Sequence, residues 1–281
     1  MKLSSLFLVL TALAAIHQAQ SEPLRSDLER AHRAAIAQKY ARAAWPLGAV
    51  HAGLPTATEL AGFAPGELVA EDGLLVRTYA RAGTSAFVLE SRVADDAAGA
   101  QETLIDWLAG VQSAARMPSV AEAGLALGEA GFVGRSGARP GALAWIAFVR
   151  GNVAVRVTAC DLVETPELEL GPVALALDRA IQRTGVLELG RKPARPALAR
   201  FEAAPSAVAG TKLPLTLAGV EDGAHLQWRV GGSGLGYVER ESDGGWDLHT
   251  TGPGKMSVQL DVIGALGTVT SRSLELDVAD D

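Results

Sequence analysis

Apolar and polar residues alternate along the last third of the chain. The alternation runs through residues 213–217, 226–230, 256–262 and 274–278, with turn-forming Gly, Asp and Pro residues between the runs. A period of two places one set of side chains in a core and the other in water, as in half-buried antiparallel strands. The pattern therefore predicts an all-β sandwich domain over residues 202–281.

Residues 143–160 predict a central hairpin, because two apolar runs flank Gly151-Asn152, a dipeptide suited to a two-residue turn. Such a turn places three cross-strand pairs on one face: Arg150 with Val153, Phe148 with Val155, and Ile146 with Val157. The other face carries Trp145, Ala147, Val149, Ala154, Arg156 and Thr158. We expect Asn152→Gly to be tolerated and Gly151→Val to cost about 1–3 kcal/mol through strain at positive φ.

Three helices are predicted around this hairpin. Ser26 and Glu29 form a capping box before a helix that runs to about residue 44. Asp95 or Asp96 can cap a second helix, and Pro172 lies in the first turn of a third. The first helix is amphipathic and basic, so it could lie on an anionic membrane, but its short, Ala-rich apolar side favours packing on its own domain.

Further strands are predicted at residues 68–70, 74–80, 86–93 and 125–133, and an Asp-Gly hairpin dipeptide joins the first two. Consecutive strands joined by tight turns pair antiparallel. The predicted fold class is therefore α+β, an antiparallel sheet with helices on one face in a two-layer sandwich over residues 55–188.

The predicted organisation has five parts. They are a signal peptide (1–21), a helix and irregular segment (22–54), the α+β sandwich domain (55–188), a basic, Pro-rich linker (189–201) and the all-β domain (202–281). A Pro-rich linker is semi-extended and acts as a spacer.

The all-β region carries a resemblance. Trp228 occupies the position of the core Trp that immunoglobulin-like domains keep on their third strand, and residues 252–262 are similar to their corner and penultimate strand. Residues 205–278 thus resemble a bacterial immunoglobulin-like or PKD-type domain. The chain has no cysteine pair there, and Met256 stands where the family commonly has an aromatic residue. The resemblance implies a module that spaces or adheres.

Residues 1–21 have the pattern of a secretory signal. Lys2 precedes an apolar stretch from Leu6 to Ile16, and small residues at Ala19 and Ser21 fit cleavage before Glu22. An uncleaved anchor is the alternative, although the stretch is short for a membrane span. No later apolar run has membrane length. We therefore expect an exported bacterial protein of the periplasm or the extracellular space, without a stable membrane span after cleavage.

Charge and cysteine content narrow the function classes. The net charge is −7, and residues 201–281 hold 5 Lys and Arg against 12 Asp and Glu, which argues against nucleic acid as a partner. Cys160 is the only cysteine, so no intrachain disulfide can form. Its place at the end of a predicted strand favours a buried or half-buried structural thiol.

The sequence predicts no catalytic, cofactor-binding or metal-binding residue. Folding could bring His225 and His249 together, but two imidazoles without a third ligand are ordinary surface residues. Two acidic groups predict solvated faces rather than ion sites: Glu239, Glu241 and Asp243, and Glu164, Glu167 and Glu169. The Gly-rich residues 231–236 predict an inter-strand loop, and Ser136 lacks the spacing of a nucleophile elbow.

Three functions remain open. The first is a non-enzymatic envelope protein that binds or adheres to an unknown protein or envelope component. The second is a small-ligand carrier that uses the groove between sheet and helices, with Trp107 and Trp145 as natural reporters. The third is an enzyme in which folding would have to gather titratable groups such as His51, Asp106, Glu129, Arg150 and Arg156 in one cleft.

Overall fold

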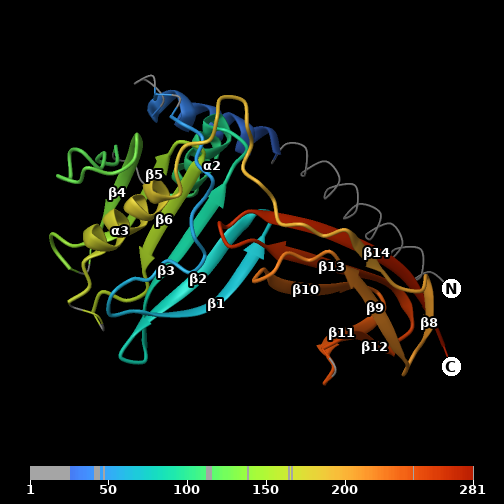
Figure 1. Cartoon of the computed structure of the whole chain (residues 1–281). Helices are drawn as coiled ribbons and strands as arrows, with labels where there is room; N and C mark the ends of the chain where they lie inside the picture. The colour runs from blue at the N-terminus through green and yellow to red at the C-terminus, as the bar shows by residue number, and fades with distance from the viewer. Residues whose placement is uncertain are drawn as a thin grey trace, which may run out of the picture.

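The structure is a computed structural model with one six-stranded and two four-stranded sheets (Figure 1). It describes residues 26–40, 45–46, 48–111, 116–137, 139–163, 165, 167–242 and 244–280. Residues 26–40 are helical, and the predicted signal peptide lies outside the described residues. In the described part of the chain, no helix is both long enough and apolar enough to cross a membrane.

The first part of the chain is an antiparallel sheet with helices, as the α+β prediction requires. Its strands are β1 (Ala64–Glu71), β2 (Leu74–Arg81), β3 (Thr84–Val93), β4 (Ala130–Arg135), β5 (Leu143–Arg150) and β6 (Val153–Ala159). They pair in the order β1-β2-β3-β6-β5-β4. Asp72 and Gly73 both have positive φ between β1 and β2, as a type I′ hairpin turn requires.

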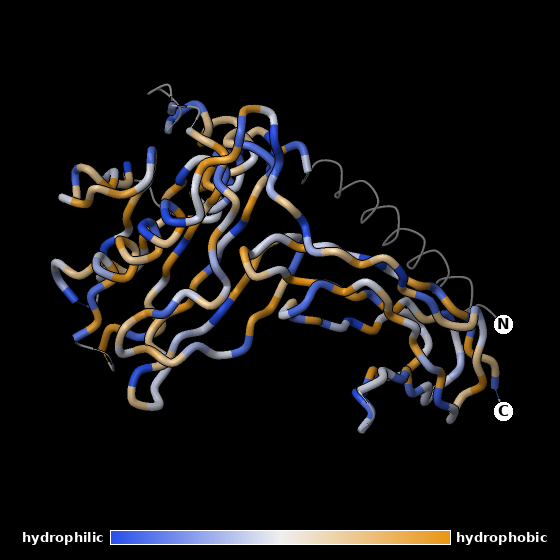
Figure 2. The backbone as a smooth tube through the Cα atoms, in the orientation of Figure 1, coloured by the Kyte–Doolittle hydropathy of each residue, from blue (hydrophilic) through white to orange (hydrophobic). Residues whose placement is uncertain are grey.

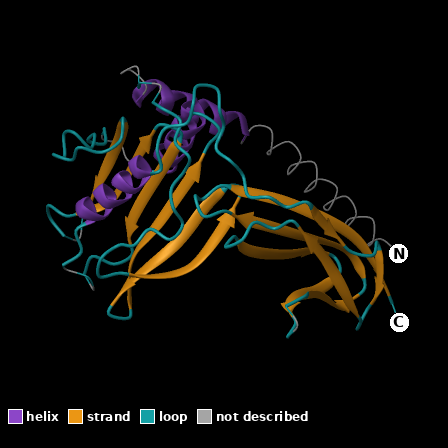
Figure 3. Ribbon diagram, viewed as in Figure 1, coloured by secondary structure: helices purple, strands orange, loops and turns teal. Residues whose placement is uncertain are grey.

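The two labelled helices lie on opposite faces of this sheet, so the prediction of helices on one face is wrong (Figure 3). They are α2 (Ala97–Gly110) and α3 (Leu170–Arg183). Ile146 and Phe148 of β5 share a core with α3, whereas Ala147 and Val149 share one with α2. Successive strand residues point to opposite faces, and β5 is apolar on both. Helix 26–40 joins the α2 face through Tyr40, which confirms that it packs on its own domain.

The β5–β6 hairpin has the predicted register, with Arg150 opposite Val153, Phe148 opposite Val155 and Ile146 opposite Val157. Gly151 has a φ of +55°, and Asn152 is not among the residues with positive φ. This combination matches a type II′ turn, in which the first central residue is Gly.

The second part of the chain has two sheets that share one core. The strands of one sheet, in spatial order, are β11 (Leu235–Arg240), β12 (Trp246–Gly252), β9 (Lys212–Ala218) and β7 (Arg200–Glu202). Those of the other are β10 (His225–Gly232), β13 (Gly254–Ile263), β14 (Val269–Ala279) and β8 (Ser206–Val208). Figure 2 follows the alternation of apolar and polar positions along these strands.

Apolar side chains join the two parts directly. Leu68, Ala70 and Leu75 from β1 and β2 form a cluster with Ile263, and Val269 packs against it. Figure 1 shows β1 and β2 beside the ends of β13 and β14 that carry these residues. The two parts therefore share a small core as well as a connecting segment.

The connecting segment is bonded to both parts. Lys192 and Arg195 pair with Asp95, which lies just before α2. On the other side, the Thr268 hydroxyl donates to the carbonyl of Ala194 at 2.6 Å. These contacts fix the path of the Pro-rich segment.

Candidate functional site

An open, mainly apolar groove of about 400 Å³ runs along the sheet face beside α2. Its floor crosses four neighbouring strands, and α2 forms the wall. The lining residues are Val76, Val88, Glu90, Trp107, Leu108, Val111, Trp145, Ala147, Arg156 and Thr158. The groove exists because α2 packs on β3, β5 and β6, while β2 extends the sheet beyond the helix. Both tryptophans predicted as reporters of a sheet–helix pocket line it.

An ion pair on the groove floor supplies its charged groups. Arg156 and Glu90 are cross-strand neighbours on β6 and β3, and their side chains pair through two hydrogen bonds. The side chains of Arg156 and Glu90 are 27% and 14% exposed, so water reaches the pair only in part. The Arg156 guanidinium also lies 5.2 Å from the centre of the Trp107 ring, a cation–π arrangement.

The arginine keeps donors for a ligand. Glu90 accepts from Nε and Nη2 of Arg156, which leaves Nη1 outside the ion pair. A molecule with an apolar body could lie along Trp107 and place one hydrogen-bond acceptor against Nη1. The groove thus combines a large apolar contact surface with one oriented polar group.

The position of Trp145 depends on a glycine opposite it. Gly134 is its cross-strand partner on β4, and a Cβ at residue 134 would lie 2.0 Å from the Trp145 Nε1 atom. The indole therefore lies directly over the Gly134 backbone, which only Gly permits.

A second cluster of titratable groups surrounds the tip of the β5–β6 hairpin. Arg150 forms two hydrogen bonds with Asp178 of α3, at 2.8 and 2.6 Å, and pairs with Glu129 at 3.5 Å. The charges of Glu129 and Arg150 also act on His51. Three residues of the hypothetical enzyme set, His51, Glu129 and Arg150, are therefore close together. Burial is the largest influence and lowers the pKa of His51.

This cluster holds the hairpin tip in place. The Glu129 carboxylate accepts from the Gly151 amide, and the Asn152 side chain bonds the amide of His51 and the carbonyl of Ala94. Asn152 is completely buried, so residues 150–152 form an internal turn. Apart from Nδ1 of His51, which is buried without a hydrogen-bond partner, these polar groups bond one another or the backbone. The cluster therefore anchors the hairpin tip to α3, to Ala94 just before α2 and to the segment before β1.

The other members of the enzyme set lie elsewhere. Asp106 is on the exposed side of α2, where it pairs with Arg33 of helix 26–40. Arg156 faces the α2 groove, whereas Arg150, six residues earlier, reaches α3 on the opposite face. The structure therefore divides these residues among three places.

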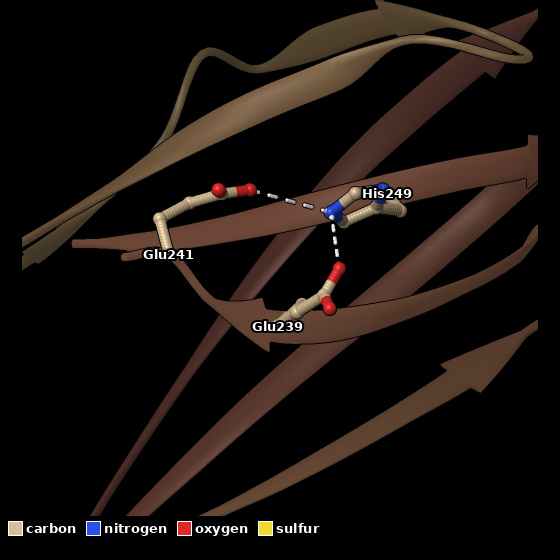
Figure 4. A group of neighbouring side chains, drawn as sticks. All are labelled: Glu239, Glu241 and His249. Atoms are coloured by element: carbon tan, nitrogen blue, oxygen red, sulfur yellow. Dashed lines mark ion pairs between the residues drawn. The ribbon is translucent and has the colours of Figure 1, made fainter. Parts of the chain in front are cut away.

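A third group of side chains lies on the outer face of the β11–β12 pair (Figure 4). The carboxylates of Glu239 and Glu241 lie 3.2 and 3.8 Å from Nε2 of His249. Among the described residues, this is the group of His, Cys, Asp and Glu close enough to share a metal ion. His225, the predicted partner of His249, is on β10 in the other sheet.

The structure also tests predictions made for other residues. Cys160 is exposed, which corrects the prediction of a buried or half-buried thiol, because β6 ends at Ala159 and the thiol lies in the following loop. Partial burial still raises its pKa. The Gly-rich stretch predicts an inter-strand loop over residues 231–236, but only residues 233–234 form the turn, because β10 extends to Gly232 and β11 begins at Leu235. Asp243 and Glu164 lie outside the described residues.

A polar cleft of about 650 Å³ lies where the two parts of the chain meet. Its lining includes Arg92, Asp95, Arg195, Arg229 and Thr268. Asp95 and Arg195 pair with each other, and Arg229 pairs with a buried aspartate of β13. The first pair ties the connecting segment to the first part, and the second lies within the second part.

No protein-family model matches this chain, and a comparison with curated proteins gives no match.

Proposed function

We propose that this chain is a non-enzymatic binding protein of the bacterial cell envelope. Its α+β domain takes an apolar ligand into the groove beside Trp107 and Trp145. The observation that carries the proposal is this groove, which joins an apolar floor to the Arg156–Glu90 pair. The signal-like sequence of residues 1–21 supports export to the periplasm or beyond.

The groove favours a ligand with a flat or chain-like apolar body and one hydrogen-bond acceptor. Trp107 and Trp145 offer large apolar surfaces, and burying such surface contributes about 25 cal/mol per Å² before the costs of association. The acceptor would approach Nη1 of Arg156, the nitrogen that Glu90 leaves unused.

The second domain serves in this proposal as an immunoglobulin-like module that spaces or adheres. Two features support it. The strand orders β11-β12-β9-β7 and β10-β13-β14 correspond to the two sheets of an immunoglobulin constant domain. Trp228 lies on β10, the third strand of that scheme counted without β8, and packs on Phe201 and Trp246 at 5.7 and 5.2 Å between ring centres.

Tryptophan fluorescence tests the groove. Titration with 1-anilinonaphthalene-8-sulfonate or a medium-chain fatty acid should give saturable 1:1 binding that changes the emission of Trp107 and Trp145. Val88→Glu places a charge on the groove floor and should weaken binding by at least about tenfold, equal to about 1.4 kcal/mol.

Two controls make the result specific. Trp246→Phe, in the second domain, should keep the binding signal, and Trp145→Phe should reduce it. Val186→Glu introduces the same charge at an exposed valine away from the groove and should bind like wild type. Equal binding by Val88→Glu and wild type would refute the proposal.

A further inference from the structure

The β11–β12 pair holds three potential metal ligands in fixed relative positions. Tyr237 and His249 are direct cross-strand partners, and so are Glu239 and Asp247. Cross-strand partners share a face, and so do residues two apart on one strand, such as Tyr237 and Glu239. The side chains of Glu239 and His249 therefore project on the same side of the sheet. Glu241 follows β11, and its amide donates to the carbonyl of Gly245 at 2.9 Å within the turn that leads to β12.

The imidazole of His249 is held in one orientation. The Tyr237 ring stacks on it with 4.7 Å between ring centres and 10° between planes. The His249 side chain is 14% exposed, and its buried Nε2 atom has no partner in hydrogen-bond geometry within the described chain. Its nearest polar neighbours are the carboxylates of Glu239 and Glu241, which form ion pairs with a protonated ring (Figure 4). A buried imidazole nitrogen without a hydrogen bond is costly unless something else satisfies its lone pair.

The distances around Nε2 fit a shared cation. Zinc binds nitrogen and oxygen at about 2.0–2.2 Å, so adjacent ligand atoms in a tetrahedral site lie about 3.3–3.6 Å apart. Nε2 lies 3.2 Å from Oε2 of Glu239 and 3.8 Å from Oε1 of Glu241. All three ligand atoms lie within 4.8 Å of one another. Small side-chain rotations would complete the geometry.

Lys212 occupies the position of a competitor. Its ammonium group donates to Oε1 of Glu241 at 2.7 Å from the neighbouring strand β9. Its charge offsets one of the two carboxylates, whereas a divalent cation would offset both. A bound metal must therefore share Glu241 with Lys212 or displace the ammonium group.

We propose that Glu239, Glu241 and His249 form a zinc site on the second domain. One imidazole and two carboxylates are a donor set that suits zinc better than calcium or magnesium, which prefer oxygen alone. Three protein ligands leave a coordination position for water or a partner's side chain. The site is separate from the groove and does not depend on the proposed function.

Zinc titration of the tag-free full chain tests the site. With a chromophoric chelator as competitor, zinc chloride should bind 1:1 and raise the melting temperature. His249→Phe keeps a ring against Tyr237 but removes the nitrogen, and should weaken binding by at least about tenfold. Glu239→Gln should have the same effect, and because Glu239 is 56% exposed, this variant should fold even if His249→Phe does not.

Two further variants test whether zinc binds at this site and competes with Lys212. His225→Phe removes an exposed histidine from the same domain and should bind zinc like wild type. Lys212→Met removes the competing ammonium group and should bind zinc about threefold more tightly or better. The proposal is overturned if wild type does not bind zinc, if Glu239→Gln binds like wild type, if Lys212→Met binds no more tightly, or if calcium binds in preference.

Discussion

Two turns of the first sheet, between β2 and β3 and between β5 and β6, need glycine for different reasons. Gly83 and Gly151 both have positive φ, at +84° and +55°. A Cβ at Gly83 would meet nothing within 4 Å, whereas a Cβ at Gly151 would lie 1.7 Å from the carbonyl oxygen of Ala49. Gly83→Ala should therefore cost about 1 kcal/mol from backbone strain alone.

Gly151→Ala should cost at least about 3 kcal/mol, because the segment before β1 must also move. This exceeds what strain alone predicts for Gly151→Val. Urea unfolding of both variants gives the comparison, and equal midpoints for Gly83→Ala and Gly151→Ala would show that the close approach to Ala49 is absent.

The Asn152 side chain reverses an expectation drawn from the sequence. Turn chemistry alone predicts that Asn152→Gly is tolerated. The side chain, however, accepts from the His51 amide at 2.6 Å and donates to the Ala94 carbonyl at 2.9 Å in a buried site. Asn152→Gly leaves both groups without a partner and should cost about 2–4 kcal/mol of unfolding free energy. Unchanged stability in chemical denaturation would contradict this.

At the same scale, strand alternation alone bears on the candidate sites. Arg150 and Arg156 were predicted to lie on opposite faces of the hairpin, and this register is confirmed. Opposite faces cannot contribute to one cleft, so the enzyme set conflicted with the pairing. The approach of Glu239 to His249 could not be predicted, because it depends on the register between β11 and β12, which the sequence of either strand leaves open.

At the scale of elements, the two labelled helices differ at their N-termini. Asp96 accepts from the Gly99 amide at 2.9 Å and caps α2, as predicted, whereas Glu169 caps α3 without a side-chain hydrogen bond. Asp96→Ala should lose about 1 kcal/mol, and Glu169→Ser should gain up to about 1 kcal/mol. Thermal unfolding measures both, and equal shifts of the same sign would contradict this account.

Helix positions along the chain were predictable, but the sheet faces they cover were not. Capping residues and apolar periodicity mark a helix locally. The face depends on the side to which the connection crosses. One indication was available, since Ile146 to Val149 is an uninterrupted apolar run, which is typical of a strand covered on both faces. That run separates the α3 core from the α2 core.

At the scale of the molecule, composition predicted the linker but not the contact between the parts it joins. In the sequence, nothing distinguishes Leu68 and Ile263 from residues that pack inside the core of their own domain. Only the fold shows that they meet. Polar bonds support this contact, since the Ala70 amide donates to the Gln227 side chain at 2.5 Å and the Thr56 amide to the Ala265 carbonyl at 2.8 Å.

Two neighbours on β13 allow this junction to be tested apart from domain stability. Ile263 joins the junction cluster, whereas Val262 faces the core between the two sheets of the second domain. Ile263→Asp buries an unpaired charge between the parts, which should separate them at a smaller free-energy cost than unfolding either one. Small-angle X-ray scattering should then show a larger radius of gyration, and calorimetry two resolved transitions.

Val262→Ala provides the matched control. It leaves a cavity inside the second domain and should cost about 0.5–3 kcal/mol while the scattering profile stays that of wild type. If Ile263→Asp also left the profile unchanged, the bonds of the linker and of Gln227 would be sufficient to hold the parts together. In that case the apolar junction would be a consequence of the arrangement, and these polar bonds together would be its main cause.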